Sequence, residues 1–192
     1  MKYDVYGIGN ALVDKEFEIE DDFLKEFSIE KGMMTLVDRE QQDQLLSELT
    51  WRYGVKTRSG GGSAANTLYA ISQFGGSAFY SCRVANDETG DFFLQQLGDH
   101  NIQTNKNSQR VEGVSGRCIV MVTPDAERTM HTYLGVSDNI SISEMDFEAA
   151  LNCEYMYLEG YLVTSDTARS ALIEMKDFAK SNGIKPALTF SD

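Results

Sequence analysis

The feature that most constrains the fold of this chain is a regular alternation of short apolar runs with longer amphipathic segments. The short runs predict β-strands, at residues 3–9, 77–85, 119–122, 155–158 and 186–190. The longer segments carry apolar residues at helical spacing and predict helices, at residues 39–53, 63–74, 87–100 and 164–182. We expect Asp87 to be the N-cap of the third of these helices. Strands that alternate with helices predict a parallel sheet with crossover helices, and therefore an α/β fold.

Two strand-rich stretches interrupt this alternation, residues 12–38 and 104–135. Neither contains a long helical pattern, and charged and apolar residues alternate over residues 15–20. We expect the two stretches to form a small antiparallel sheet over one edge of the main domain. The chain of 192 residues has no low-complexity tract or convincing repeat, so we predict one domain, 1–192, with these segments inserted in it.

The charge and the start of the chain exclude several classes of partner. The formal net charge is −13, from 17 basic and 30 acidic side chains, so most of the surface would repel a nucleic acid. No apolar run approaches the roughly 20 residues that a membrane span requires. The N-terminal residues, which include Asp4, lack the apolar segment of a signal peptide. We therefore expect a cytoplasmic protein with neither nucleic-acid nor membrane partners.

The cysteines and histidines form no metal-binding or catalytic pattern. Cys82, Cys118 and Cys153 are far apart in the sequence and odd in number, which predicts neither a zinc site nor a disulfide framework. His100 and His131 lie near no Gly-x-Ser-x-Gly elbow and have no second histidine four residues away. We expect no metal ligands in this chain, and zinc hydrolases and triad hydrolases are disfavoured.

A first glycine motif follows the N-terminal predicted strand. Gly7 and Gly9 match the beginning of a dinucleotide-binding fingerprint, but Leu12 stands at the third glycine position and no helix is predicted to begin there. The pattern therefore argues against an NAD site. Asn10 and Asp14 remain as polar side chains just after a central strand, and the alternative is that they only shape a turn.

A second glycine motif, Ser59-Gly60-Gly61-Gly62-Ser63-Ala64-Ala65-Asn66, leads into the helix predicted over 63–74. Glycines let the backbone approach a ligand closely, and the first amides of a helix are free to donate hydrogen bonds. No Gly-Lys-Ser or Gly-Lys-Thr follows, so the motif is not a P-loop. Asn66 falls in the first helical turn, where its amide group both donates to and accepts from a hydroxyl. An ordinary loop before a helix is the alternative interpretation.

Taken together and in order, these motifs resemble those of the PfkB, or ribokinase-like, family of carbohydrate and nucleoside kinases. The matching segments are Gly9-Asn10-x-x-x-Asp14, Gly61-Gly62-Ser63-x-x-Asn66, Phe74-Gly75-Gly76, Val84-Ala85-Asn86-Asp87-x-x-Gly90, Glu127-Arg128-Thr129-Met130, Leu134-Gly135-Val136-Ser137 and Tyr157-Leu158-Glu159-Gly160-Tyr161. The fourth segment departs from the Gly-x-Asp-x-x-Gly that is common in the family. The resemblance covers essentially the whole chain.

The resemblance implies a fold, a doubly wound parallel α/β sheet with a small β-sheet lid. The two strand-rich stretches would supply the lid. It also implies a site for sugar hydroxyls, because residues matching Asp14 and Asn66 bind these groups in relatives. A carboxylate accepts two hydrogen bonds from neighbouring hydroxyls, and buried hydroxyls need such partners.

The remaining predicted substrate-binding residues come from the same two motifs. In relatives, the backbone matching Gly61 and Gly62 lies against the sugar. Asn10 and Ser63 belong to these motifs and are included in the predicted site.

The resemblance further implies an ATP-dependent, Mg²⁺-dependent kinase that phosphorylates the hydroxymethyl group of a ribose-bearing substrate. The two glycine motifs and Thr132-Tyr133-Leu134-Gly135 look most like adenosine-kinase relatives, which favours a purine nucleoside. A free-sugar kinase similar to ribokinase or fructokinase stays open. So does a non-catalytic sugar-binding module, or one that forms a homodimer through exposed lid strands.

Arg128 has two interpretations. Its flanking residues predict a strand or hairpin of the lid, where an exposed arginine would have no catalytic role. The resemblance to nucleoside kinases instead implies a clamp on the transferring phosphoryl group, whose oxygens carry negative charge.

One family signature has no counterpart in the sequence. The Gly-Ala-Gly-Asp block, whose Asp is the general base in the family, matches nothing in residues 1–192. We therefore expect a fold truncated on its C-terminal side, a kinase as the parent protein, and no activity of this chain alone.

Overall fold

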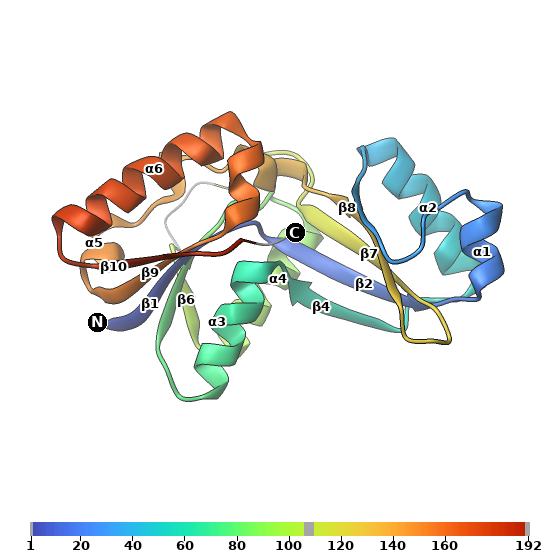
Figure 1. Ribbon diagram of the computed structural model, residues 1–192, viewed down its shortest axis with the longest axis horizontal. Coiled ribbons are helices and arrows are strands. Elements are labelled where there is room, and N and C mark those ends of the chain that lie inside the picture. Colours follow the sequence, from blue (N-terminus) through green and yellow to red (C-terminus); the bar gives the residue numbers. More distant parts are fainter. Residues whose placement is uncertain (1, 106–109, 191–192) are drawn as a thin grey trace.

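The computed structural model describes residues 2–105 and 110–190, which form two five-stranded β-sheets (Figure 1). The first sheet is parallel throughout and has the strand order β10-β9-β1-β5-β6. Its strands are β1 (Tyr3–Ile8), β5 (Ala78–Ser81), β6 (Ile102–Thr104), β9 (Cys153–Leu158) and β10 (Lys185–Leu188). The predicted parallel α/β sheet is thus confirmed.

Helices cover both faces of the parallel sheet, which makes it doubly wound. α3 (Ser63–Gln73) and α4 (Glu88–Asp99) lie on one face, and α5 (Phe147–Leu151) and α6 (Asp166–Ser181) lie on the other (Figure 1). Tyr6 and Ile8 of β1 are fully buried in the core under α6, while Val5 packs into the core under α3. Side chains of a strand alternate between faces, so one strand serves two cores.

Short 3₁₀ helices complete the connections of this domain. They are η1 (Gly135–Asn139), η2 (Ile142–Glu144) and η3 (Gly160–Thr164). Within residues 2–105 and 110–190, no helix is long and apolar enough to cross a membrane.

The predicted start of α4 is confirmed by its cap. The Asp87 carboxylate accepts a hydrogen bond from the Gly90 amide at 2.8 Å, and it also accepts from the amide and hydroxyl of Ser115. These hydrogen bonds hold the pKa of Asp87 below its usual range against the opposing effect of burial, which is the largest single influence on it. One side chain therefore caps a helix and also fastens it to the segment just before the strand that begins at Gly116.

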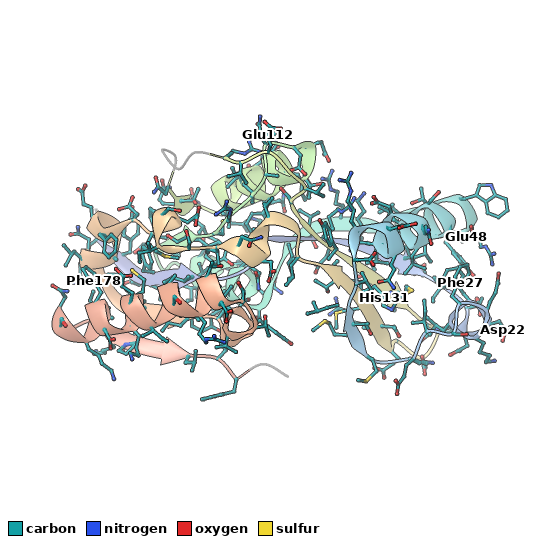
Figure 2. The ribbon with its side chains drawn as sticks, turned by 90° about the horizontal axis from the view of Figure 1, so that it is seen from above. Asp22, Phe27, Glu48, Glu112, His131 and Phe178 are labelled. Atoms are coloured by element: carbon teal, nitrogen blue, oxygen red, sulfur yellow. The ribbon has the colours of Figure 1, made fainter. Side chains whose placement is uncertain are left out.

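The second sheet is mixed and has the strand order β3-β8-β7-β2-β4. Its strands are β2 (Leu12–Glu18), β3 (Met34–Leu36), β4 (Thr57–Gly61), β7 (Gly116–Val122) and β8 (Arg128–Tyr133). α1 (Asp21–Glu26) and α2 (Arg39–Arg52) pack on one face over a separate core that includes Phe17, Phe23 and Leu49. Seen from above, Phe178 on α6 and Phe27 next to α1 lie at opposite ends of the molecule (Figure 2).

Two predictions about this second sheet are wrong in detail. It is not antiparallel throughout, because β2 pairs parallel with β7, and β3 pairs parallel with β8. Only β7 and β8 are joined by a short hairpin, and long connections between the other strands permit parallel pairing. The expected glycine-rich loop also begins as a strand, since β4 pairs with β2 from Thr57 to Gly61.

The chain passes between the two sheets at four places. One is the connection from β6 to β7, and the other three border the ligand site. β1 of the parallel sheet leads into β2 of the mixed sheet through residues 9–11. β4 leads into α3 through Gly62, and β8 leads into η1 through Leu134. The carboxyl end of β1, where α/β proteins bind ligands, therefore faces the mixed sheet.

Candidate functional site

A cleft of about 270 Å³ lies at this junction between the two sheets. Its lining residues are Asn10, Leu12, Asp14, Met34, Leu36, Gly62, Ser63, Asn66, Cys118, Arg128, Met130, Thr132, Leu134, Glu159, Tyr161 and Thr164. Six of the seven residues predicted from the sequence line it. The seventh, Gly61, lies directly behind Asp14.

Asn10 is held in place by three neighbours at the end of β1. Its amide donates to Glu159 Oε2 at 2.6 Å, and its carbonyl accepts from the Tyr80 hydroxyl at 2.8 Å. Its side-chain oxygen accepts from the Ser137 hydroxyl at 3.2 Å. These contacts leave the Nδ2 group as the donor that Asn10 can offer to a ligand.

Two close contacts of the backbone leave no room for a side chain at positions 61 and 62, so both residues are glycine. A Cβ on Gly61 would lie 2.5 Å from Asp14 Oδ1, so the carboxylate packs directly against the β4 backbone. Gly62 has φ +97°, and a Cβ there would lie 2.8 Å from the Asn10 carbonyl oxygen. The glycines thus bring the β4–α3 connection against the two polar residues of the first motif.

Asp14 is the half-buried carboxylate of the cleft, and it has no donor of its own. Within residues 2–105 and 110–190, no protein group donates a hydrogen bond to it. Burial raises its pKa to about 6, against the positive charge of Arg128, which lowers the pKa. A carboxylate in this state gains most from ligand hydroxyls that donate to it.

Arg128 stands at the first position of β8 and is exposed. Its guanidinium is close enough to Asp14 to affect the pKa of that carboxyl, although the described part of the chain holds no ion pair of Arg128. Arg128 therefore lines the cleft as an exposed cation. Its role as a phosphate clamp stays a prediction.

Ser63 and Asn66 lie in the first turn of α3, as the sequence predicts. The Ser63 hydroxyl donates to Glu159 Oε1 at 2.6 Å, which directs this side chain toward β9. The Asn66 amide donates to the Gly62 carbonyl, and its exposed side chain lines the cleft. Of the two, Asn66 is the side chain with a polar group directed to a ligand.

Sequence reasoning did not assign Glu159 to the site. It lies at the carboxyl end of β9 with 1% of its surface exposed, and it lines the cleft. The segment around it was matched to the family only as a block. An acidic residue between an apolar strand and a glycine is the signal that indicates a buried carboxylate there.

A set of apolar side chains from the mixed sheet was missed as well. They come from β2, β3, β8 and the residue after β8, and they line the cleft: Leu12, Met34, Leu36, Met130 and Leu134. Alternation along the strands turns these residues to the face that α1 and α2 leave uncovered. We call these five side chains the apolar shelf.

The described residues do not fit a metal site. In residues 2–105 and 110–190 no group of three or more His, Cys, Asp or Glu side chains is placed to hold a metal ion. Among the described residues that line the cleft, Arg128 is the one arginine or lysine. No step through Mg²⁺ or ATP is therefore assigned to residues of this chain.

Comparisons with known proteins agree with this geometry. A family model described as pfkB family carbohydrate kinase matches residues 32–190. The guanosine-inosine kinase of Escherichia coli (strain K12) is 23% identical over 191 residues, which cover 96% of this chain and 44% of that protein.

Solved structures give the same picture. The adenosine kinase from Sinorhizobium meliloti is 33% identical with a TM-score of 0.90, and the match covers 100% of this chain and 57% of that one. A probable sugar kinase from Rhizobium etli CFN 42 is 30% identical with a TM-score of 0.91, with 100% and 57% covered. The chain thus spans about half the length of these relatives.

Proposed function

Because the chain belongs to the pfkB family of carbohydrate kinases, we propose that it forms the substrate-binding part of an ATP-dependent kinase that phosphorylates the hydroxymethyl group of a ribose-bearing substrate. The observation that carries the proposal is the environment of the Asp14 carboxylate. This carboxylate faces a cleft at the carboxyl ends of parallel strands and lacks a protein donor, while Asn66 lines the same cleft. Neighbouring hydroxyls of a sugar satisfy both groups at once.

The preferred substrate is a purine nucleoside. A free sugar has no flat apolar part, and a nucleoside has a base that buries apolar surface. The apolar shelf lines the same cleft as Asp14 and Asn66 and supplies that surface. The mixed sheet then acts as a lid that covers the substrate. Relatives described as adenosine kinase and guanosine-inosine kinase support the same choice.

Arg128 is proposed to stabilise the phosphoryl group. A cation that lines the cleft offsets charge that collects on the transferring oxygens.

A free-sugar kinase is the second candidate, because the R. etli relative is described as a probable sugar kinase. Equilibrium binding to the folded chain distinguishes the two. Adenosine, inosine and guanosine are titrated beside ribose and fructose, with Asn66→Ala as the variant. We expect nucleosides to bind and free sugars to bind far more weakly. Binding of ribose or fructose without any nucleoside would exclude the nucleoside proposal.

A further inference from the structure

The Glu159 carboxylate lies at the N-terminus of α3 and uses both of its oxygens there. Oε1 accepts from the Ser63 hydroxyl at 2.6 Å and from the Ala64 amide at 3.0 Å. Oε2 accepts from the Asn10 amide at 2.6 Å. One buried side chain therefore joins the end of β9, the end of β1 and the first turn of α3.

This position is where a helix ordinarily binds an anion. The first amides of a helix have no partner within the helix, and the helix dipole favours negative charge beside them. α3 is eleven residues long and its N-terminus borders the cleft. Without Glu159, the amides of Ala64 and Asn10 would be free to bind a phosphate group.

The acidic side chains of the cleft also disfavour a bound phosphate. Among the described residues that line the cleft, Asp14 and Glu159 are the two with carboxylates. Arg128 is the one arginine or lysine among them. A phosphate at the α3 end would meet the Glu159 carboxylate, with the Asp14 carboxylate in the same cleft. Uncharged hydroxyls meet acceptors there instead.

We propose that Glu159 is a specificity-determining residue: its carboxylate occupies the anion position at the N-terminus of α3, so this end of the cleft accepts hydroxyl groups and excludes phosphate. The choice of a nucleoside as the hydroxyl-bearing ligand rests on the proposed function. The exclusion of phosphate does not. The expected consequence is that a sugar already phosphorylated on the edge that faces α3 is rejected.

The test is an NMR titration of the ¹⁵N-labelled chain with inorganic phosphate, followed at the amides of Asn10, Ser63 and Ala64. In the wild-type chain we expect these resonances to stay in place. In Glu159→Ala they should shift on phosphate addition, with an affinity gain on the order of tenfold. Glu159→Gln keeps one acceptor without the charge and should gain less. Asp14→Asn is the matched control, since it removes the other carboxylate and leaves the α3 amides capped.

A second titration compares adenosine with its 3′-monophosphate. Wild type should prefer the nucleoside, and Glu159→Ala should reduce that preference by a similar factor. Phosphate-induced shifts at the three amides of the wild-type chain would overturn the proposal, and this readout needs no variant to fold. Folded Glu159→Ala or Glu159→Gln without a gain for phosphate would overturn it as well. If adenosine fails to bind while phosphate behaves as expected, the nucleoside function is wrong and the role of Glu159 stands.

Discussion

At the scale of single residues, Asp14 couples the packing of the site to its chemistry. β4 brings Gly61 against the carboxylate, and the missing Cβ is what permits the contact. The same burial makes the charged form of Asp14 unfavourable. A ligand that donates hydrogen bonds to this carboxylate would stabilise its charged form, because no described protein group does so.

This burial predicts a pH dependence of stability. The pKa of Asp14 is about 6 in the folded chain, above the value of about 3.9 expected in the unfolded chain. The folded state therefore binds the proton more tightly. The contribution of Asp14 to stability is fully present below the unfolded pKa and is lost as the pH rises through about 6. The loss amounts to roughly 2–3 kcal/mol.

Denaturant unfolding of wild type and Asp14→Asn at a series of pH values measures this effect. The stability of wild type relative to the asparagine variant should fall between about pH 4 and pH 7, because asparagine does not titrate. Parallel pH profiles for the two proteins would show that Asp14 is not perturbed by burial.

At the scale of elements, the site depends on how β4 is joined to α3. Gly62 makes this connection with a left-handed backbone, and the Asn10 carbonyl lies where a side chain would begin. The hydrogen bonds of Glu159 then fix the first turn of α3 against β1 and β9.

Replacing Gly62 should therefore cost stability. Gly62→Ala forces a Cβ into a left-handed conformation and toward a carbonyl oxygen, which destabilises by roughly 1–3 kcal/mol. Gly98 in α4 is the matched control, because a Cβ there meets nothing within 4 Å. Gly98→Ala should be neutral or stabilising by up to about 1 kcal/mol. Thermal unfolding of both variants decides; equal effects would contradict the account.

Many of the helices and strands could be predicted from local patterns in the sequence. The helices beginning at Arg39, Ser63 and Glu88 follow from apolar spacing and from caps such as Asp87. The parallel sheet follows from the alternation of elements. The mixed pairing of the second sheet does not, because register and direction there are set by partners far away in the sequence.

Some residues of the candidate site could be predicted from the sequence and others could not. Asn10, Asp14 and Asn66 stand in recognisable motifs. Glu159 follows β9, and the apolar shelf comes from β2, β3, β8 and the residue after β8, so only the fold brings them to the cleft. A buried carboxylate and a set of methionines and leucines carry no local signal of a shared cavity.

At the scale of the whole molecule, the chain has two sheets with a cleft between them. The core under α1 and α2 belongs to the mixed sheet alone, and a second core joins Val13 of that sheet to α3 and β5. The polar side chains proposed to bind hydroxyls come from β2 of the mixed sheet and from α3, and the apolar shelf comes from the mixed sheet and the residue after β8. The arrangement provides for binding and orientation of a substrate, on which phosphoryl transfer largely depends.

We predict that the 192-residue chain by itself has no phosphotransferase activity. Under the proposed function, the described residues would bind the substrate hydroxyls, and Arg128 is the one proposed to contact the phosphate. A coupled assay of ADP release with ATP, Mg²⁺ and a panel of nucleosides should stay at background. Turnover that persists after repurification and disappears in Asn66→Ala would show that the prediction is wrong.

The edges of the mixed sheet predict self-association. β3 and β4 are its outer strands in the described chain, and their unpaired backbone groups can pair with a second copy. Light scattering should detect a homodimer whose population rises with concentration. Thr35 and Thr57 are exposed on these strands, and Thr35→Lys or Thr57→Lys should weaken the dimer because edge charges oppose pairing. A monomer at every concentration would contradict this.

The central claim is that Asp14 recognises ribose hydroxyls, and calorimetric titration of the chain with adenosine and 2′,3′-dideoxyadenosine tests it most directly. Wild type should bind adenosine more tightly by about tenfold to a few hundredfold, as expected for hydrogen bonds to a charged group. Asp14→Ala should lose most of that preference. Equal affinity of the folded wild-type chain for the two nucleosides would contradict the claim.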